Sequence, residues 1–262
     1  MENNYVSGPK GPSRRAFLSA SAATAVAAPL ASVIAPASAA SASVGPATTT
    51  GNFDPALRAL LGQIDPGRIE ATIQRLVQFG TRHTASSQTD PVRGIGAATN
   101  WVFGQMQGFA AASNGNMTVQ KQTFVQPVSN RIPVPTTITN VIATLQGTAS
   151  PPRFYVVTGH LDSRVTDLLN STDDAPGADD DGSGVACVLE LARLFATHQF
   201  TGTIVLATLA GEEQGLYGST LMANQMAAAG NDVQGMFSND IVAASQAFDG
   251  TRPDPFTLRM FL

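Results

Sequence analysis

The sequence is poor in cysteine and in charge. Its 262 residues include one cysteine, Cys187, and a single thiol excludes an internal disulfide, a zinc site built from several cysteines and an iron–sulfur cluster. Only 13% of the residues are charged, and no run of lysine and arginine is present that could neutralise several phosphates. The composition therefore argues against a nucleic-acid partner. Apolar residues make up 43%, enough to bury a core, which excludes disorder for most of the chain.

The N-terminal segment has the pattern of an export signal. Arg14 and Arg15 precede an alanine-rich apolar run over residues 20–35, which ends in the small triplet Ala37-Ser-Ala39. A disordered tail and an uncleaved membrane anchor are the alternatives, but the run is alanine-rich and lacks flanking aromatic residues, which favours a signal. We expect an exported protein that meets the membrane only transiently, through this segment. The predicted organisation is a twin-arginine-type signal peptide over residues 1–39, a linker over 40–52 and a folded domain over 53–262.

The rest of the sequence alternates between helix and strand patterns. Asp65 followed by Pro66 predicts a helix start, because aspartate caps helix N-termini and proline fits the first turn; the apolar helical spacing continues to Gly80. Further helices are expected over residues 94–111, 184–198 and 219–229, and strands over 118–125, 137–145, 154–158 and 203–209. This alternation predicts an α/β domain layered around a mainly parallel sheet.

Polar residues follow directly after the apolar strand pattern of residues 154–158. His160 and Asp162 are two positions apart, so in an extended chain they point to the same side and the carboxylate can orient the imidazole. Ligands of open α/β sheets bind at such carboxyl ends of strands. A purely structural His/Asp pair is the alternative for this short motif.

Three consecutive carboxylates, Asp179, Asp180 and Asp181, stand before the helix predicted from residue 184. A solvated loop would tolerate their mutual repulsion. A calcium-binding EF-hand loop is a second alternative, but it requires a preceding helix, and Pro176 and Gly177 occupy that place.

Two further groups of acids complete the pattern. Glu212 and Glu213 follow the strand predicted over residues 203–209, and Asp240 ends the apolar stretch that begins at Phe237. Adjacent carboxylates just past a buried strand cost stability unless a cation compensates them. One imidazole and several carboxylates at successive element ends form a ligand set for a divalent metal ion.

Taken together, these motifs resemble the di-zinc aminopeptidases of metallopeptidase family 28. The segments that carry the resemblance are His160-Leu-Asp-Ser, the loop Ala175-Pro-Gly-Ala-Asp-Asp-Asp-Gly-Ser-Gly, Ala210-Gly-Glu-Glu-Gln-Gly and Asn239-Asp240. The resemblance extends from about residue 80 to 262 and implies a three-layer fold with a twisted, mostly parallel sheet between helices.

The resemblance also implies a role for each polar residue. It assigns one Zn²⁺ to His160, Asp180 and Asp240, and a second Zn²⁺ to Asp180 and Glu213. Glu212 is the implied general base, and Asp162 orients His160. Two zinc ions bring four positive charges against three ligand carboxylates, and the surplus polarises a carbonyl and lowers the pKa of a bridging water.

We therefore expect zinc-dependent hydrolysis of peptide bonds, with peptides as substrates and removal of N-terminal residues as the reaction. A carboxypeptidase or a glutaminyl cyclase on the same scaffold is an alternative, as is a non-catalytic exported metal-binding domain. A serine hydrolase is not expected, because Ser183 lies in Asp-Gly-Ser-Gly-Val rather than in a Gly-x-Ser-x-Gly elbow.

One departure from the family pattern concerns histidine. The family's second zinc takes a histidine about a hundred residues beyond the position of Glu213, whereas this sequence stops at Leu262, within a strand expected from about Phe256. We expect a C-terminally truncated domain whose second zinc site lacks that ligand. His198 is predicted to lie near a helix C-terminus, and His83 is a weak candidate for a ligand or a substrate contact. Cys187 is expected to be a core thiol.

Overall fold

A computed structural model describes residues 54–244 of the chain. The predicted signal peptide and linker, and the strand expected near Phe256, lie outside these residues. The helices are α1 (Pro55–Leu61), α2 (Pro66–Val77), α3 (Ile95–Ala111), α4 (Gly182–Phe195), α5 (Glu212–Gly215) and α6 (Tyr217–Ala228). The strands are β1 (Met117–Gln126), β2 (Thr136–Leu145), β3 (Arg153–His160), β4 (Thr203–Leu209) and β5 (Asp232–Ser238).

The five strands form one sheet in the order β1-β2-β4-β3-β5. The strand β2 is antiparallel to both β1 and β4, whereas β3 is parallel to both β4 and β5. Four of these five described strands thus run in one direction and only β2 runs the other way. The predicted mostly parallel sheet is confirmed, with a β1–β2 hairpin at one edge.

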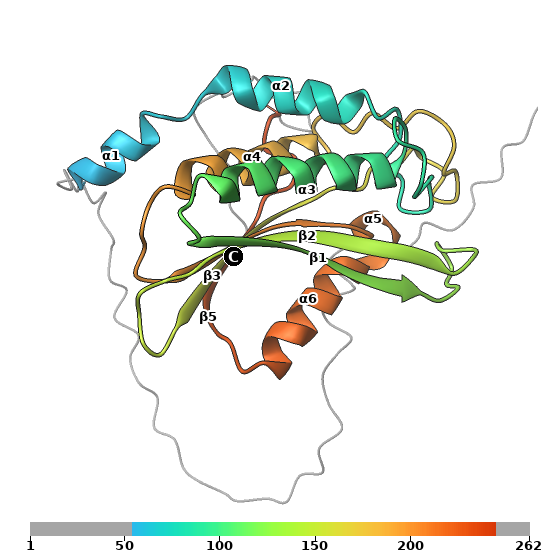
Figure 1. Cartoon of the computed structure of the whole chain (residues 1–262). Helices are drawn as coiled ribbons and strands as arrows, with labels where there is room; N and C mark the ends of the chain where they lie inside the picture. The colour runs from blue at the N-terminus through green and yellow to red at the C-terminus, as the bar shows by residue number, and fades with distance from the viewer. Residues whose placement is uncertain (1–53, 245–262) are drawn as a thin grey trace, which may run out of the picture. The chain divides into compact units, whose positions relative to one another are not determined.

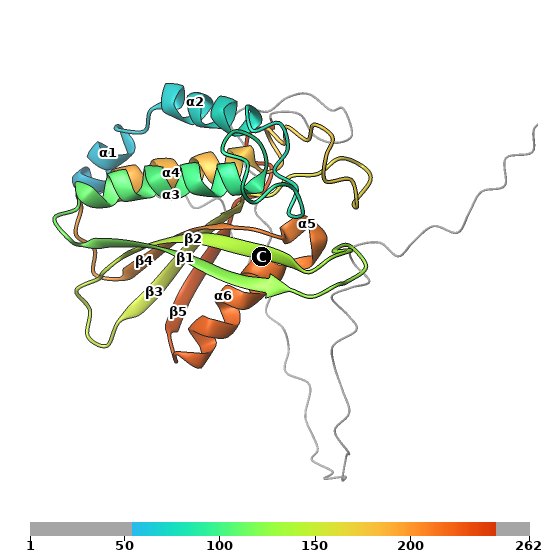
Figure 2. The same ribbon diagram turned by 45° about the vertical axis from the view of Figure 1, so that its right-hand side comes forward.

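Helices cover both faces of the sheet, which confirms the three-layer α/β class (Figures 1 and 2). Helices α3 and α4 pack on one face with α2 outside them, and α6 packs on the other. The larger core cluster fills the first interface with residues such as Val102, Met106 and Leu206, and a smaller one joins Val205 to Met222 of α6. Apolar burial on both faces explains the nearly continuous hydrophobic pattern of β2 and β4.

The helix starts follow local chemistry. The side chain of Asp65 accepts the backbone N–H groups of Gly67 and Arg68, with Pro66 in the first turn, as the sequence predicts. The predicted helix over 184–198 is shorter in the structure, because α4 ends at Phe195. Helix α1 and strand β5 were not predicted as elements.

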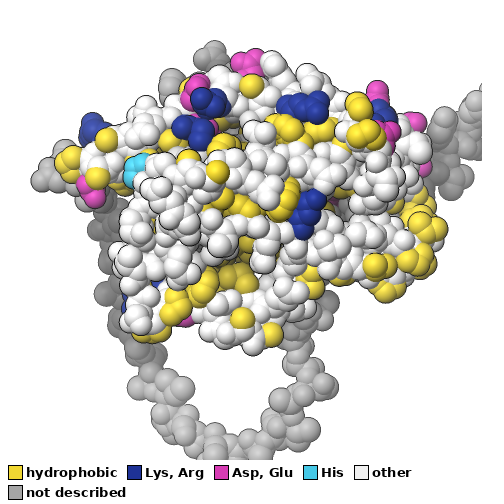
Figure 3. Space-filling view, viewed as in Figure 1, with side chains coloured by type: hydrophobic (Ala, Val, Ile, Leu, Met, Phe, Trp, Pro, Cys, Tyr) yellow, Lys and Arg dark blue, Asp and Glu magenta, His cyan; other side chains and the backbone are white. Residues whose placement is uncertain are grey.

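The surface reflects the composition. On the face shown in Figure 3, basic and acidic side chains stand as separate groups among uncharged ones. No helix within residues 54–244 is both long and apolar enough to cross a membrane.

This topology brings three strand ends together. In the parallel register, His160 at the end of β3 pairs with Leu209 of β4, and Thr158 of β3 pairs with Ser238 of β5. The segments that leave β3, β4 and β5 therefore emerge at one edge of the sheet, next to the N-terminus of α4. The catalytic and metal-binding residues that the family resemblance implies all lie at the end of β3 or on these segments.

Candidate metal centre

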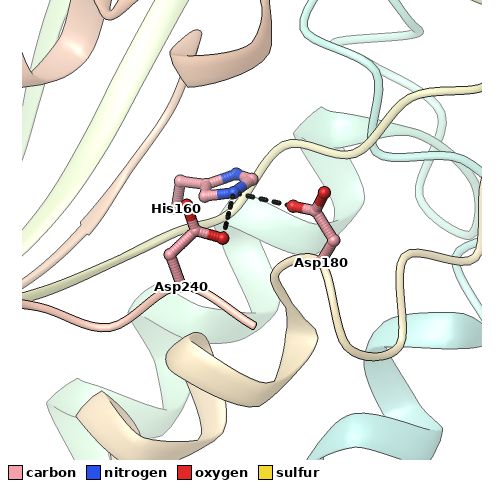
Figure 4. Close-up of side chains that lie close together, drawn as sticks. All are labelled: His160, Asp180 and Asp240. Carbon is pink, nitrogen blue, oxygen red and sulfur yellow. Dashed lines mark ion pairs between the residues drawn. The ribbon is translucent and has the colours of Figure 1, made fainter. Parts of the chain in front are cut away.

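His160, Asp180 and Asp240 form a compact group at this edge (Figure 4). Each offers one ligand atom, and the three atoms lie within 4.8 Å of one another. The Nε2 atom of His160 is 3.0 Å from Oδ1 of Asp180 and 4.0 Å from Oδ1 of Asp240. The imidazole is buried, whereas the carboxylates of Asp180 and Asp240 are 45% and 47% exposed. The group is therefore open to solvent on its acidic side.

The orientation of the imidazole is fixed by the backbone. Its Nδ1 atom lies 3.0 Å from the carbonyl oxygen of Asp162. A carbonyl oxygen can only accept, so Nδ1 carries the hydrogen and Nε2 faces the two aspartates. Burial opposes a charged imidazole, but the nearby carboxylates of Asp162 and Asp180 outweigh it and raise the pKa of His160 to about 12.

The carboxylate of Asp162 does not hydrogen-bond to the imidazole of His160, although the sequence predicts that it orients this ring. Its Oδ1 atom is 3.7 Å from Nδ1 of His160, so the direct hydrogen bond that orients the ring comes from its backbone instead. The fully buried carboxylate accepts the backbone N–H groups of Glu212 at 3.1 Å and Glu213 at 3.0 Å, and the hydroxyl of Thr84 at 3.2 Å. Asp162 thus ties the segment after β3 to the first turn of α5.

The three consecutive aspartates have three different surroundings. Asp180 faces His160, and the hydrogen bond from His160 holds the pKa of Asp180 below its usual value. Asp181 turns inward and accepts the backbone N–H groups of His160 and Gly184, both at 2.8 Å, which caps α4. Burial raises the pKa of Asp181 to about 7. Asp179 accepts the backbone N–H of Ala243 at 3.0 Å. Of the three aspartates, Asp180 is therefore the one placed to bind a metal ion, as the sequence predicts.

Glu212 and Glu213 both lie next to the group, but Glu213 is not a member of it in the part of the chain that the structure describes. Its carboxylate, 9% exposed, accepts the Nε–H of Arg164 at 2.5 Å. The structure therefore unites three of the four predicted ligands. Glu212 is half-buried in the first turn of α5, and this burial raises the pKa of its carboxyl.

Sequence reasoning missed Arg82. Its guanidinium is fully buried and donates to four backbone carbonyls, those of Leu76, Leu161, Pro176 and Gly177, at 2.7–3.2 Å. Burial lowers the pKa of Arg82 to about 10. One side chain thus holds the end of α2, the residue after His160 and the loop before Asp180. The only sequence signal is its neighbour His83, which drew attention to the loop.

The other two histidines and the cysteine lie outside the ligand group. His83 is buried; its Nδ1 accepts the backbone N–H of Ala85 and its Nε2 lies 3.0 Å from the carbonyl oxygen of Leu168. Both ring nitrogens are therefore engaged, and His83 is not a member of the group. His198 lies just past α4, with Nδ1 2.9 Å from the carbonyl oxygen of Leu194, as expected for a helix C-terminus. Cys187 is only partly buried and lies outside both core clusters, so the expected core thiol is wrong; its partial burial raises the pKa of the thiol.

The donors fit a zinc ion. An imidazole nitrogen with its other nitrogen hydrogen-bonded, together with two carboxylates, is a common set of protein ligands for Zn²⁺. A cation would also compensate the negative charge that Asp180, Asp240 and Glu212 concentrate here.

Comparisons with known proteins agree with this geometry. Residues 140–249 match the family described as Peptidase family M28. A "Probable zinc metalloprotease" of Pyricularia oryzae is 53% identical over 208 residues, which are 79% of this chain and 41% of that protein. Two solved structures share the fold at a TM-score of 0.56. A leucine aminopeptidase precursor from Bacteroides thetaiotaomicron is 20% identical (70% of this chain, 65% of that one), and the Porphyromonas gingivalis glutaminyl cyclase is 24% identical (70% and 63%).

The fold and the ligand group define a three-layer α/β domain with a candidate zinc site at the carboxyl ends of its parallel strands. The chain belongs to peptidase family M28, and the resemblance inferred from its motifs is confirmed. It spans less than half the length of the curated relatives it matches.

Proposed function

We propose that the chain carries the zinc-binding part of an aminopeptidase and hydrolyses the first peptide bond of its substrates. The observation that carries the proposal is the group of His160, Asp180 and Asp240, whose ligand atoms lie within 4.8 Å of one another. The name of the Pyricularia oryzae relative supports a zinc metalloprotease, and one of the solved structures that share the fold is titled a leucine aminopeptidase precursor.

In the proposed reaction, a zinc ion and Glu212 have separate roles. A zinc ion held by His160, Asp180 and Asp240 would supply a Lewis acid that polarises the scissile carbonyl and acidifies water. Glu212 accepts the proton of the attacking water and returns it to the leaving amine. Burial raises the pKa of Glu212, which makes it a stronger base than an exposed glutamate. The hydrogen bond from its backbone N–H to Asp162 fixes the turn that carries it.

The charge left at the site when zinc is bound favours the amino end of a peptide. A zinc ion held by Asp180 and Asp240 would offset the charges of these two carboxylates, so Glu212, half-buried beside them, would remain the negative group. A free ammonium group would be attracted to Glu212, whereas a C-terminal carboxylate would be repelled. This charge pattern favours an aminopeptidase over a carboxypeptidase.

The test is turnover of an aminoacyl-p-nitroanilide by the zinc-loaded chain. Glu212→Gln should abolish turnover while zinc stays bound, and Glu70→Gln, an exposed change on α2, should leave both unchanged. Loss of zinc from Glu212→Gln would mean that Glu212 is a ligand. An N-acetylated anilide should be inert; its hydrolysis would contradict the aminopeptidase. Cyclisation of an N-terminal glutamine without hydrolysis would identify a glutaminyl cyclase instead.

We also propose that residues 1–39 direct export of the folded chain through the twin-arginine motif. Replacement of Arg14 and Arg15 together by lysine should then keep the protein inside the cell. Export of this double variant at the normal level would contradict the proposal.

A further inference from the structure

The most unusual ion pair next to the candidate metal centre joins Arg164 to Glu213. Arg164 follows the His160-Leu-Asp-Ser segment directly, and its Nε–H donates to Oε2 of Glu213 at 2.5 Å. The side chains are 31% and 9% exposed, so little water screens the pair. Its Nη1 also donates to the carbonyl oxygen of Val165 at 3.3 Å, which holds the guanidinium in place.

Glu213 has little freedom to leave this partner. Its backbone N–H donates to the buried carboxylate of Asp162 at 3.0 Å. Its carbonyl oxygen accepts Nη1–H of Arg131 at 3.0 Å. The backbone of Glu213 is thus held on both sides, and a cation that approaches its carboxylate meets Arg164 there.

Arg164 is also close to Asp180. The pKa of Asp180 is lowered first by its hydrogen bond with His160, and the positive charge of Arg164 lowers it further. The guanidinium therefore acts on both carboxylates that the family resemblance assigns to a second zinc ion. In contrast, the resemblance assigns His160 and Asp240 to the first ion only, and both belong to the observed ligand group.

We propose that Arg164 is the resident cation of Glu213 and competes with a second zinc ion, so that this chain binds one zinc tightly and a second only weakly. The inference rests on the proposed zinc-dependent function. A second ion at Asp180 and Glu213 must break a poorly solvated ion pair and face the charge of the guanidinium. A neutral side chain at position 164 removes both costs.

Arg164 could instead support binding of the second zinc ion, and this role predicts the opposite change in zinc affinity. If Arg164 only orients Glu213 for the metal, as hydrogen-bonded partners of metal ligands often do, its loss weakens the second ion. The sign of the change in zinc affinity therefore decides between competition and orientation.

The experiment is a zinc titration of the full chain, read by calorimetry and by the zinc content after equilibrium dialysis. The neutral variants are Arg164→Gln and Arg164→Met, either of which suffices if the other fails to fold. Arg164→Lys keeps the charge, and Arg153→Gln, which changes an exposed arginine on β3, is the control.

We expect the neutral variants to bind the second zinc at least tenfold more tightly, with the first zinc unchanged. Arg164→Lys and Arg153→Gln should stay within about threefold of the unaltered chain. Unchanged or weaker second binding in the neutral variants overturns the inference, as does failure of every variant to bind a second ion. Loss of the first zinc from the unaltered chain would instead refute the proposed function, so the two failures are distinguishable.

Discussion

The carboxylate of Asp162 accepts the backbone N–H of Glu213 at 3.0 Å, although 51 residues separate the two in sequence. The same carboxylate accepts the N–H of Glu212. One buried side chain therefore fixes the distance between the candidate metal ligand His160, which lies two residues earlier, and the proposed general base. The first turn of α5 has no side-chain cap of its own, so Asp162 supplies the acceptor that its N–H groups need.

Asp162→Asn should destabilise the chain and weaken zinc binding. The new amide keeps one acceptor but places its NH₂ group against a backbone N–H, which leaves a buried donor without a partner. We expect the free energy of unfolding to fall by about 3 kcal/mol. Chemical denaturation measures this loss, and Asp173→Asn, an exposed change in the loop after β3, is the control. A loss no larger than that of the control would contradict the anchoring role.

Arg82→Met should be among the most damaging single changes. It retains much of the side-chain volume but leaves the buried carbonyls of Leu76 and Leu161 and two partly buried carbonyls without their donor, at a cost of about 4 kcal/mol. Arg93→Met provides the comparison, since Arg93 forms an exposed pair with Asp174 worth at most about 1 kcal/mol. Urea unfolding of both variants measures the difference. Equal losses of unfolding free energy in the two variants would show that the buried hydrogen bonds of Arg82 do not determine its contribution to stability.

Gly159→Ala should displace α4 from β3. A Cβ atom at residue 159 would lie 2.5 Å from the carbonyl carbon of Gly184, and this backbone contact cannot rotate away. We expect a loss of at least about 2 kcal/mol and weaker zinc binding, because Asp180 lies only two residues before the start of α4. Gly104→Ala, where nothing lies within 4 Å on helix α3, should instead stabilise by roughly 0.5–1 kcal/mol. Thermal unfolding compares the two, and similar behaviour would contradict the close packing.

Zinc uptake should release a proton from His160. The pKa of His160 is raised from 6.5 to about 12 without metal, so the imidazole is protonated at pH 8 and must lose a proton to bind. Because the folded pKa lies above the unfolded one, this group's stabilisation of the metal-free chain is complete below pH 6.5 and is lost as the pH rises towards 12. Calorimetry in buffers of different ionisation enthalpy should report the release of about one proton when the first zinc ion binds. The control His198→Ala should release the same number of protons. No proton release would contradict the assignment.

Much of the site could be predicted because it depends on strand ends. Apolar strand patterns that end shortly before His160 and Glu212, and the apolar stretch before Asp240, place polar groups at one edge of a parallel sheet. The same pattern predicts the α/β layers. Strand β5 escaped prediction as an element because most of its residues are exposed and show no regular alternation.

Other features depend on contacts that the sequence does not encode locally. Which of three adjacent aspartates turns inward depends on backbone torsions, and Asp181 rather than its neighbours became the cap of α4. Arg82 binds carbonyl groups, which every residue has, so its partners leave no trace in the sequence. The pairing of Arg164 with Glu213 likewise requires the path of two loops that lie 49 residues apart.

The most direct test of the account is a crystal of the zinc-soaked chain, measured at the zinc absorption edge. We expect an anomalous peak in contact with Nε2 of His160 and one carboxylate oxygen each of Asp180 and Asp240. A peak without His160 among its neighbours, or no peak at this edge of the sheet, would contradict the metal centre and with it the proposed peptidase.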